Sequence, residues 1–365
     1  MNDAAEAMDI SLRRAEQQSG FKALSAYVGV SGTAVRSTAA HDAVQLRQGR
    51  GRISLGDVSR VLDQAKQIEL PSDHLMLHLL PHHYSVDGVE GIKNPVGMVG
   101  RRLEVTANVL SGSAGPMQNL MRCLDAIRIS PDALVPEPLA AGRAVLDDEE
   151  REDGVLLIDL GGNTSDAGIF HGGSLIFTCS VPAGGGQISN DLAYGLGTTF
   201  STAETLKQRY GSTLSGLNGT NQMVSIPESA GHQGFQVEQH VLAEIVDARC
   251  AETFELLREQ ILRRGFGDCY PAGVVLTGGA CQLAGCERLA EEVLGVRARR
   301  GAPRRLLGLA DAVRGPAFSA SVGLLIWGSE QMAASPHDTG RLQRWSESLN
   351  AWVRNFYDAS TRRTQ

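Results

Sequence analysis

One short segment of the chain carries residue types that could bind a phosphate and a metal ion. In residues 155–173 an apolar run ends near Asp159, and Gly161 and Gly162 separate it from a second apolar run. Glycine lets the backbone approach a ligand closely, so such a turn can aim several N–H groups at a phosphate. The Asp159 carboxylate could then hold a metal-bound water beside that phosphate. The segment therefore predicts a nucleotide-binding strand–turn–strand hairpin.

Two further glycine clusters could complete the same site. Residues 183–186 stand at an expected helix start, where the helix dipole favours an anion. Residues 276–285 (LTGGACQLAG) combine a strand end with a glycine turn on which a flat base could lie. Between the two clusters, Glu204 and Lys207 are spaced i and i+3, which places both side chains on one helix face. A carboxylate there can accept hydrogen bonds from ribose hydroxyls, and a lysine can line a base pocket.

Taken alone, each glycine cluster is best interpreted as a tight turn. Three clusters in this order, each at a strand end or a helix start, are much harder to explain as unrelated turns. Hydrophobic periodicity predicts the elements that position them. The expected strands and helices around the site are a helix at 137–145, an acidic surface turn at 147–153, helices at 187–194, 202–210, 237–264 and 286–294, a strand at 272–277 and a buried apolar helix at 318–327.

Composition and charge describe a globular protein. The 365 residues, 42% hydrophobic and 21% charged, suffice for two or more domains. The net charge of −7 argues against bulk nucleic-acid binding. No apolar run approaches the ~20 residues of a transmembrane helix, and the first residues lack the apolar core of a secretory signal. Six cysteines without a C-x-x-C pair predict reduced thiols in a cytosolic protein, not a disulfide framework or a zinc site.

The order of phosphate hairpin, glycine loop, Glu-x-x-Lys and T-G-G loop resembles that of the actin-like ATPase superfamily. Within it, the chain resembles the FtsA family of bacterial cell-division proteins over nearly its whole length. The tracts that carry the resemblance are 27–32 (YVGVSG), 77–81 (LHLLP), 86–97 (VDGVEGIKNPVG), 137–141 (EPLAA), 190–196 (NDLAYGL), 203–207 (AETLK) and 321–325 (SVGLL). The resemblance implies an actin-like (ribonuclease-H-like) two-lobed α/β ATPase fold.

The resemblance also implies a division into domains. Residues 25–130, with strands at 26–31, 74–80 and 103–110 and helices at 53–68 and 116–127, would form an SHS2-like subdomain specific to the family. The remaining expected parts are lobe I at 1–24, 131–153 and 313–328, lobe IIA at 154–200 and 269–312, lobe IIB at 201–268, a linker at 329–340 and a terminal helix at 341–357.

ATP with Mg²⁺ is the cofactor that the resemblance implies. Asp159 would position Mg²⁺ through a bound water, and hydrolysis would be weak at most, because no other residue resembles a strong general base. The residues implied to contact the nucleotide are Gly161, Gly162, Asn163 and Thr164 at the phosphates, Gly184, Gly185 and Gly186 in the glycine loop, Glu204 and Lys207 at ribose and base, and Gly278, Gly279, Ala280 and Gln282 at the adenine.

The sequence departs from the family pattern in three places. Asn163 and Ala280 stand where the family has a third glycine, and asparagine tolerates the left-handed conformation that the hairpin turn could require. The family also begins with a strand–turn–strand that carries a first phosphate loop. The residues before Tyr27 contain no such pattern, and Gly20 is the only glycine among them. Either the sequence begins late, or this copy lacks half of its phosphate clamp.

Residues 341–357 predict an amphipathic helix. At about 100° per residue, one stripe is apolar. Residues 341–363 contain five arginines and only two acidic residues, Glu347 and Asp358, so the segment is basic. Two tryptophans on such a helix suit a bilayer interface, and the segment resembles the family's membrane-targeting helix; the alternative is docking on the protein's own core. The stripe expected to bind membrane consists of Leu342, Trp345, Leu349, Trp352, Val353 and Phe356.

The function that the resemblance implies is a polymer-forming membrane anchor in the Z ring. The protein would be cytoplasmic, peripheral on the inner membrane at the division septum, and bound to the C-terminal tail of FtsZ, to itself, to other divisome proteins and to anionic lipids, but not to nucleic acid. Three alternatives stay open: a sugar-kinase-type enzyme of the same superfold, an actin-like pilus-assembly scaffold, and a nucleotide-deficient copy. The first would need a catalytic aspartate that residues 25–130 do not clearly offer, and the tryptophan-bearing terminal segment favours FtsA over the second.

A histidine cluster and an arginine cluster are both expected to have no specific function. His74, His78, His82 and His83 are expected to be incidental histidines of a loop and not a metal site. Arginines 297, 299, 300, 304 and 305 are expected to form a solvated basic face, which at an anionic membrane could add ~1 kcal/mol per charge.

Overall fold

The computed structural model describes residues 2–46, 52–214, 222–228, 234–304 and 313–334. Its largest sheet has the strand order β13-β12-β7-β8-β9. β7 (Val155–Leu160), β8 (Ser165–His171) and β9 (Ser174–Val181) are antiparallel neighbours, whereas β12 (Val274–Thr277) and β13 (Ala298–Arg300) run parallel to β7. The predicted glycine hairpin is therefore the β7–β8 pair, at the centre of this sheet.

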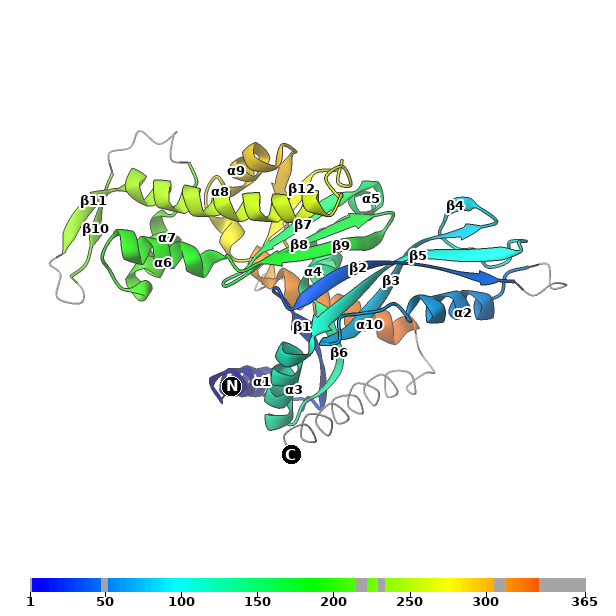
Figure 1. Cartoon of the computed structure of the whole chain (residues 1–365). Coiled ribbons are helices and arrows are strands. Elements are labelled where there is room, and N and C mark those ends of the chain that lie inside the picture. Colours follow the sequence, from blue (N-terminus) through cyan, green and yellow to red (C-terminus); the bar gives the residue numbers. More distant parts are fainter. Residues whose placement is uncertain (1, 47–51, 215–221, 229–233, 305–312, 335–365) are drawn as a thin grey trace, which may run out of the picture.

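β7 is apolar at almost every position because both of its faces are covered. Leu156 and Ile158 enter one hydrophobic core, whereas Val155 and Leu157 enter another. The first core includes side chains of α6 (Gly185–Gly195), α7 (Phe200–Tyr210), α8 (Gln239–Arg263) and α9 (Cys286–Leu294). Figure 1 shows α8 lying across this part of the molecule, with the small hairpin of β10 (Met223–Ile226) and β11 (Phe235–Glu238) beyond its N-terminal end.

The second core joins the large sheet to a smaller unit. There β1 (Ser25–Val30) pairs in parallel with β6 (Ser130–Pro136), and α4 (Glu137–Val145) packs against α10 (Ser319–Ala334). The two helices approach very closely, because a Cβ at Gly323 would lie 1.9 Å from the Ala140 carbonyl oxygen. Trp327 of α10 is buried and makes an edge contact with Tyr27, at a centroid separation of 5.4 Å.

A four-stranded antiparallel sheet of order β2-β5-β3-β4 forms the third unit. Its strands are β2 (Val35–Gln45), β3 (His74–Val86), β4 (Val89–Ile92) and β5 (Arg102–Ser113). α2 (Leu55–Ala65) covers one face, and Ser54 with Asp57 forms the capping box at its start. α3 (Ala114–Ala126) follows β5 and contacts α1 (Asn2–Ser19), whose Met8 and Leu12 pack on the same small core.

Several predicted elements need correction. The acidic turn at 147–153 is in fact the helix α5 (Asp148–Asp153), and the four histidines lie in the strand β3 and not in a loop. β3 accommodates Pro81 because the register shifts between Pro81 and His83. α10 continues to Ala334, so the first part of the expected linker is helical. The remaining short elements are the single turns η1 (Ala280–Gln282) and η3 (Pro316–Phe318).

The predicted amphipathic segment 341–357 lies outside the described residues. Within the part of the chain that the structure describes, no helix is both long enough and apolar enough to span a bilayer.

Candidate nucleotide site

A cavity of about 550 Å³ opens between the β7–β8 turn, the start of α6, the helix α7 and the turn η1. All three predicted glycine clusters contribute to it. The predicted residues that line the cavity are Gly161, Gly162, Asn163, Gly185, Gly186, Glu204, Lys207, Gly279, Ala280 and Gln282. Sequence reasoning missed Phe200, Gln208, Gly211 and Leu283, which also line it. Gln208 and Gly211 could have been found from their i+4 and i+7 spacing to Glu204.

Four predicted residues, Asp159 among them, do not line the cavity, and the other three shape its walls. A Cβ at Gly184 would lie 2.7 Å from the Gly161 carbonyl oxygen, so only glycine fits where α6 meets the hairpin. Gly278 has a φ of +86°, and a Cβ there would lie 2.3 Å from a carboxylate oxygen of Asp159. Thr164 donates its hydroxyl to Asp166 at 3.0 Å. These residues support the site and do not face the ligand space.

The glycine loop before α6 differs from its predicted role as a phosphate cradle. The Gly185 N–H donates to the Gly161 carbonyl at 2.9 Å, and the Gly186 N–H donates to the Gly162 carbonyl at 2.6 Å. These amides hold the hairpin against the helix, so in this conformation they are not available to a phosphate. Asn163 lines the cavity, and its φ is not positive. Among the described non-glycine residues, only Asp87 and Arg128 have a positive φ.

The Glu-x-x-Lys pair sits at the centre of a hydrogen-bond network. Lys207 is buried and donates to Glu204 at 2.8 Å and to the Gly185 carbonyl at 2.7 Å. Ser189 and Gln208 donate to the two Glu204 carboxylate oxygens at 2.6 and 2.9 Å. Burial opposes ionisation of Glu204, but these hydrogen bonds outweigh it and lower its pKa. Glu204 therefore stays ionised, and its hydrogen bonds with Lys207 and Ser189 fix α7 against the start of α6.

Three carboxyl groups lie close together beside the hairpin. Asp159 is only 8% exposed, and burial, with the neighbouring Glu137 and Asp166, raises its pKa to about 7. Burial also raises the pKa of Asp166, although Asp166 accepts a hydrogen bond from the Gly32 N–H at 2.8 Å. The pKa of Glu137 is raised by burial and by Asp166. Mutually repelling carboxyl groups of this kind fit a nearby divalent cation, which would offset their charge.

No described group of three or more acidic, histidine or cysteine side chains is arranged to ligate one metal ion directly. The expectation that Asp159 holds Mg²⁺ through a bound water therefore stays a prediction. Glu137 and Asp166 were missed. Both stand in tracts that the sequence singled out, but nothing in the sequence shows that α4 and β8 bring them to Asp159.

The histidine and arginine clusters lie elsewhere. His82 contacts His83 and His171, at nitrogen separations of 3.2 and 3.5 Å, and burial with the two neighbouring rings lowers the pKa of His82 to about 4. His82 therefore serves a packed contact between β3 and β8, whereas His74 bonds to Ser111 of β5 and His78 to the Leu134 carbonyl of β6.

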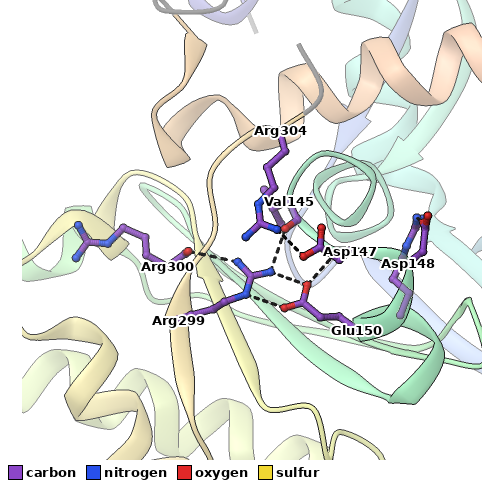
Figure 2. Close-up of polar contacts among 8 residues, drawn as sticks. Val145, Asp147, Asp148, Glu150, Arg299, Arg300 and Arg304 are labelled. Carbon is purple, nitrogen blue, oxygen red and sulfur yellow. Dashed lines mark hydrogen bonds and ion pairs between the residues drawn. The ribbon is translucent and has the colours of Figure 1, made fainter.

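Three arginines of the expected basic face form ion pairs, two of which Figure 2 shows, whereas Arg305 lies outside the described residues. Arg299 of β13 donates to both carboxylate oxygens of Glu150 in α5, at 2.7 and 2.6 Å. Arg304 pairs with Asp147 at 2.5 Å, and Arg300 pairs with a glutamate of α9 at 2.9 Å. These three charges are largely neutralised, so they do not form a free basic surface.

Comparison with known proteins places this arrangement in a family. The family profile described as "Cell division protein FtsA" matches residues 156–323, and the one described as "SHS2 domain inserted in FTSA" matches residues 32–111. The chain is 34% identical to the cell division protein FtsA of Pseudomonas aeruginosa, over 91% of this chain and 79% of that protein. It is 33% identical to the Escherichia coli K12 protein, over 82% and 74% of the two chains, and 38% identical to that of Agrobacterium fabrum, over 87% and 72%.

Solved structures bear on the fold alone, because their sequences are distant. The PilM–PilN type IV pilus biogenesis complex aligns with a TM-score of 0.59 and 14% identity, covering 89% of this chain and 84% of that one. MreB5 of Spiroplasma citri bound to ADP aligns with a TM-score of 0.51 and 14% identity, covering 60% and 67%. The predicted actin-like two-lobed α/β fold with an SHS2 insertion is confirmed, and the chain belongs to the FtsA family of cell-division proteins.

Proposed function

We propose that this protein is a nucleotide-responsive membrane anchor that polymerises and tethers FtsZ filaments to the cytoplasmic face of the inner membrane at the division septum. The observation that carries the proposal is identity of 34% to an FtsA protein over 91% of the chain, together with a family-profile match at residues 156–323 that spans every residue lining the cavity. Recruitment of later divisome proteins by such a polymer belongs to the same proposal.

ATP with Mg²⁺ is the ligand proposed for the cavity. Gly279 and Ala280, at the start of η1, have little or no side chain and so leave room for an adenine, and the Glu204–Lys207 pair on α7 lines the same cavity, where it could meet the ribose. The β7–β8 turn would face the phosphates, with Asp159 behind it holding a metal-bound water. MreB5, which shares the fold, was solved with ADP, which supports a nucleotide at this place. When bound, Mg²⁺ would supply the positive charge that the three carboxyl groups lack.

Hydrolysis is proposed to be weak. Asp159 is the general base that the sequence suggests, but it is not among the described residues that line the cavity, so it is poorly placed to accept a proton from an attacking water. The role proposed for the nucleotide is therefore to bias the protein between an open and a closed arrangement of the lobes and so to favour polymer, with slow turnover.

The membrane contact is proposed for residues 341–357, whose sequence carries the tryptophan-bearing apolar stripe. A single interfacial helix binds weakly, because ordering each residue costs about 1–2 kcal/mol. Several helices on one polymer would bind together by avidity. Anchoring would therefore depend on polymerisation, and this dependence would couple the cavity to the membrane.

Co-flotation of FtsZ filaments with liposomes tests this function. Liposomes containing anionic lipid are mixed with FtsZ, GTP and the full chain, and FtsZ is measured in the floating fraction. FtsZ should float only when the chain is present and only when FtsZ retains its C-terminal tail. The variant Trp345→Glu with Trp352→Glu should leave FtsZ at the bottom, whereas Trp327→Phe, inside the fold, is the matched aromatic control. If FtsZ without its tail floats equally well, the tethering proposal is wrong.

A nucleotide-independent tether is the second candidate. The observation that favours it is the use of the Gly185 and Gly186 amides inside the protein, which removes donors expected at the phosphates. Such a copy would join FtsZ to the membrane in the flotation assay without responding to ATP. Adding and omitting ATP in that assay separates the two candidates.

A further inference from the structure

A second cavity, of about 610 Å³, lies between two of the sheets and away from the nucleotide site. One wall is the start of β2 with the residues before it, and the opposite wall is β9 with the C-terminal end of α8. Figure 1 shows β2 running beside β9 in this region. Ser174 and Asn108 tie the two sheets together at the neighbouring end of β9, by hydrogen bonds of 2.9 and 3.0 Å.

Both walls are formed by the outermost strands of their sheets. β2 is the terminal strand of the four-stranded sheet, and β9 is the terminal strand of the five-stranded sheet. The residues that line the cavity are consecutive, 35–38 on β2 and 177–180 on β9. Because successive side chains of a strand point to opposite faces, a cavity lined by consecutive residues runs along the backbone edge of each strand.

The direction of the β9 backbone can be followed from one hydrogen bond. The Ser180 carbonyl accepts from the side chain of Gln260 at 3.2 Å, so this carbonyl points away from β8 and towards α8 and the cavity. Thr178 lies two residues earlier on the same strand, and its N–H and carbonyl face the same edge. The edge of an outermost strand is a template for pairing with another extended chain, and here Gln260 would have to give up the Ser180 carbonyl to that chain.

The charge of the cavity is unlike that of the protein as a whole. The protein carries a net charge of −7. The lining of this cavity nevertheless includes three arginines, Arg36, Arg263 and Arg264, and no aspartate, glutamate or lysine. Arg36 lies on the β2 wall, whereas Arg263 and Arg264 end the α8 wall.

The arginines are largely available to a ligand. Arg263 donates to Glu259 at 2.6 Å in an exposed pair, which is worth little. Among the residues that the structure describes, neither Arg36 nor Arg264 has an ion pair with a carboxylate. Hydroxyl groups of six serine and threonine residues supply further polar groups around them: Thr33, Ser37, Thr38, Ser111, Thr178 and Ser180.

We propose that this cleft binds an acidic segment of a partner protein in extended conformation, as a strand added along β9. Main-chain hydrogen bonds to the edge would give the segment its direction, and its alternate side chains would point towards Arg36 on one side and Arg263 and Arg264 on the other. Glutamate and aspartate satisfy this pattern, because arginine binds carboxylates in a planar, two-point geometry. The added strand would also bridge the SHS2-like sheet and the lobe II sheet.

The probe for this site is a fluorescein-labelled hexaglutamate peptide, whose like charges keep it extended. Its binding to the full chain is measured by fluorescence anisotropy at low and at moderate salt. Hexaglutamate should bind and hexalysine should not. The double variant Arg36→Ser with Arg264→Ser should weaken binding about tenfold, because it removes two exposed ion pairs. Arg13→Ser with Arg288→Ser, which changes two exposed arginines elsewhere, is the matched control and should bind as the parent does.

A second peptide tests the strand itself. Hexaglutamate with every other amide N-methylated keeps the charge but cannot pair along one edge, and it should bind about tenfold more weakly. Equal binding of the methylated peptide would overturn strand addition, and equal binding by the arginine variant would overturn the site. If pyrophosphate binds and is lost in the arginine variant while hexaglutamate does not bind at all, the cleft is a small-anion site and the proposal is wrong.

Discussion

Replacing Asp159 by asparagine gives a quantitative test of the carboxyl cluster. The folded pKa of Asp159 is about 7, against 3.8 for an exposed aspartate. Each pKa unit corresponds to about 1.36 kcal/mol, so the difference represents about 4 kcal/mol of folding free energy. Because the folded pKa is raised, the folded state keeps a proton that the unfolded chain releases. Stability should therefore fall as the pH rises from about 4 to about 7, and should level off above it.

The side-chain amide of the Asp159→Asn variant cannot ionise, so the variant should lose this dependence. Near pH 4 the parent and Asp159→Asn should unfold at similar urea concentrations. Near pH 8 the variant should be the more stable, by up to about 4 kcal/mol. The pKa values of Glu137 and Asp166 are raised in the same direction, so part of the pH dependence should remain in the variant.

The assay is urea unfolding followed by circular dichroism at several pH values, with EDTA and without nucleotide. Asp3→Asn, at an exposed position in α1, is the control and should follow the parent at every pH. Parallel curves of unfolding free energy against pH for the parent and Asp159→Asn would refute the reasoning, because they would mean that Asp159 is ionised at the same pH in both states.

Three further predictions concern the rest of the fold. Burial raises the pKa of Cys179, Cys250 and Cys281 to about 12. Of the six cysteines only Cys269 is not fully buried, so a thiol reagent at pH 8 should modify Cys269 alone in the folded protein and the others only after urea is added. Rapid modification of a second thiol in the native state would contradict this burial. Gly323→Val should lower the free energy of unfolding by about 3 kcal/mol or more, because even a Cβ at this position would lie 1.9 Å from the Ala140 carbonyl oxygen. Thermal unfolding beside Gly115→Val, at an exposed glycine with open space around it and no positive φ, measures the difference. Arg299→Ser should lower the free energy of unfolding by about 1–3 kcal/mol, because it leaves half-buried Glu150 without its two-point partner. Arg288→Ser breaks only an exposed pair and should change the urea midpoint little. Equal midpoints for these two arginine variants would show that the Arg299–Glu150 pair contributes nothing.

Much of the cavity could be predicted from local sequence. The apolar run of β7, its glycine turn and the i, i+3 spacing of Glu204 and Lys207 are short-range patterns, and each lies where its period or turn chemistry predicts. β2 was missed because its sequence, VRSTAAHDAVQ, has few large apolar residues to mark alternation. Its burial comes from α2 and from the neighbouring sheets, which the segment itself does not reveal.

The parts that escaped prediction depend on contacts between distant residues. Residues 147–153 look like an acidic turn, yet Glu150 accepts from the Asp147 N–H at 2.9 Å and from Arg299, which lies 149 residues further along the chain. Asp159, Asp166 and Glu137 come from three elements, and only the fold brings their carboxyl groups together. The internal use of the Gly185 and Gly186 amides likewise follows from the packing of α6 on the hairpin.

Isothermal titration of the full chain with ATP and Mg²⁺ tests most directly whether the glycine-lined cavity is a nucleotide site. Heat of binding with one site per chain is expected. Binding should be lost in Lys207→Gln, because the buried Lys207 holds Glu204 and the Gly185 carbonyl in place, and kept in Lys66→Gln, whose exposed lysine lies at the end of α2. No heat at high micromolar protein, with the parent folded, would contradict the account.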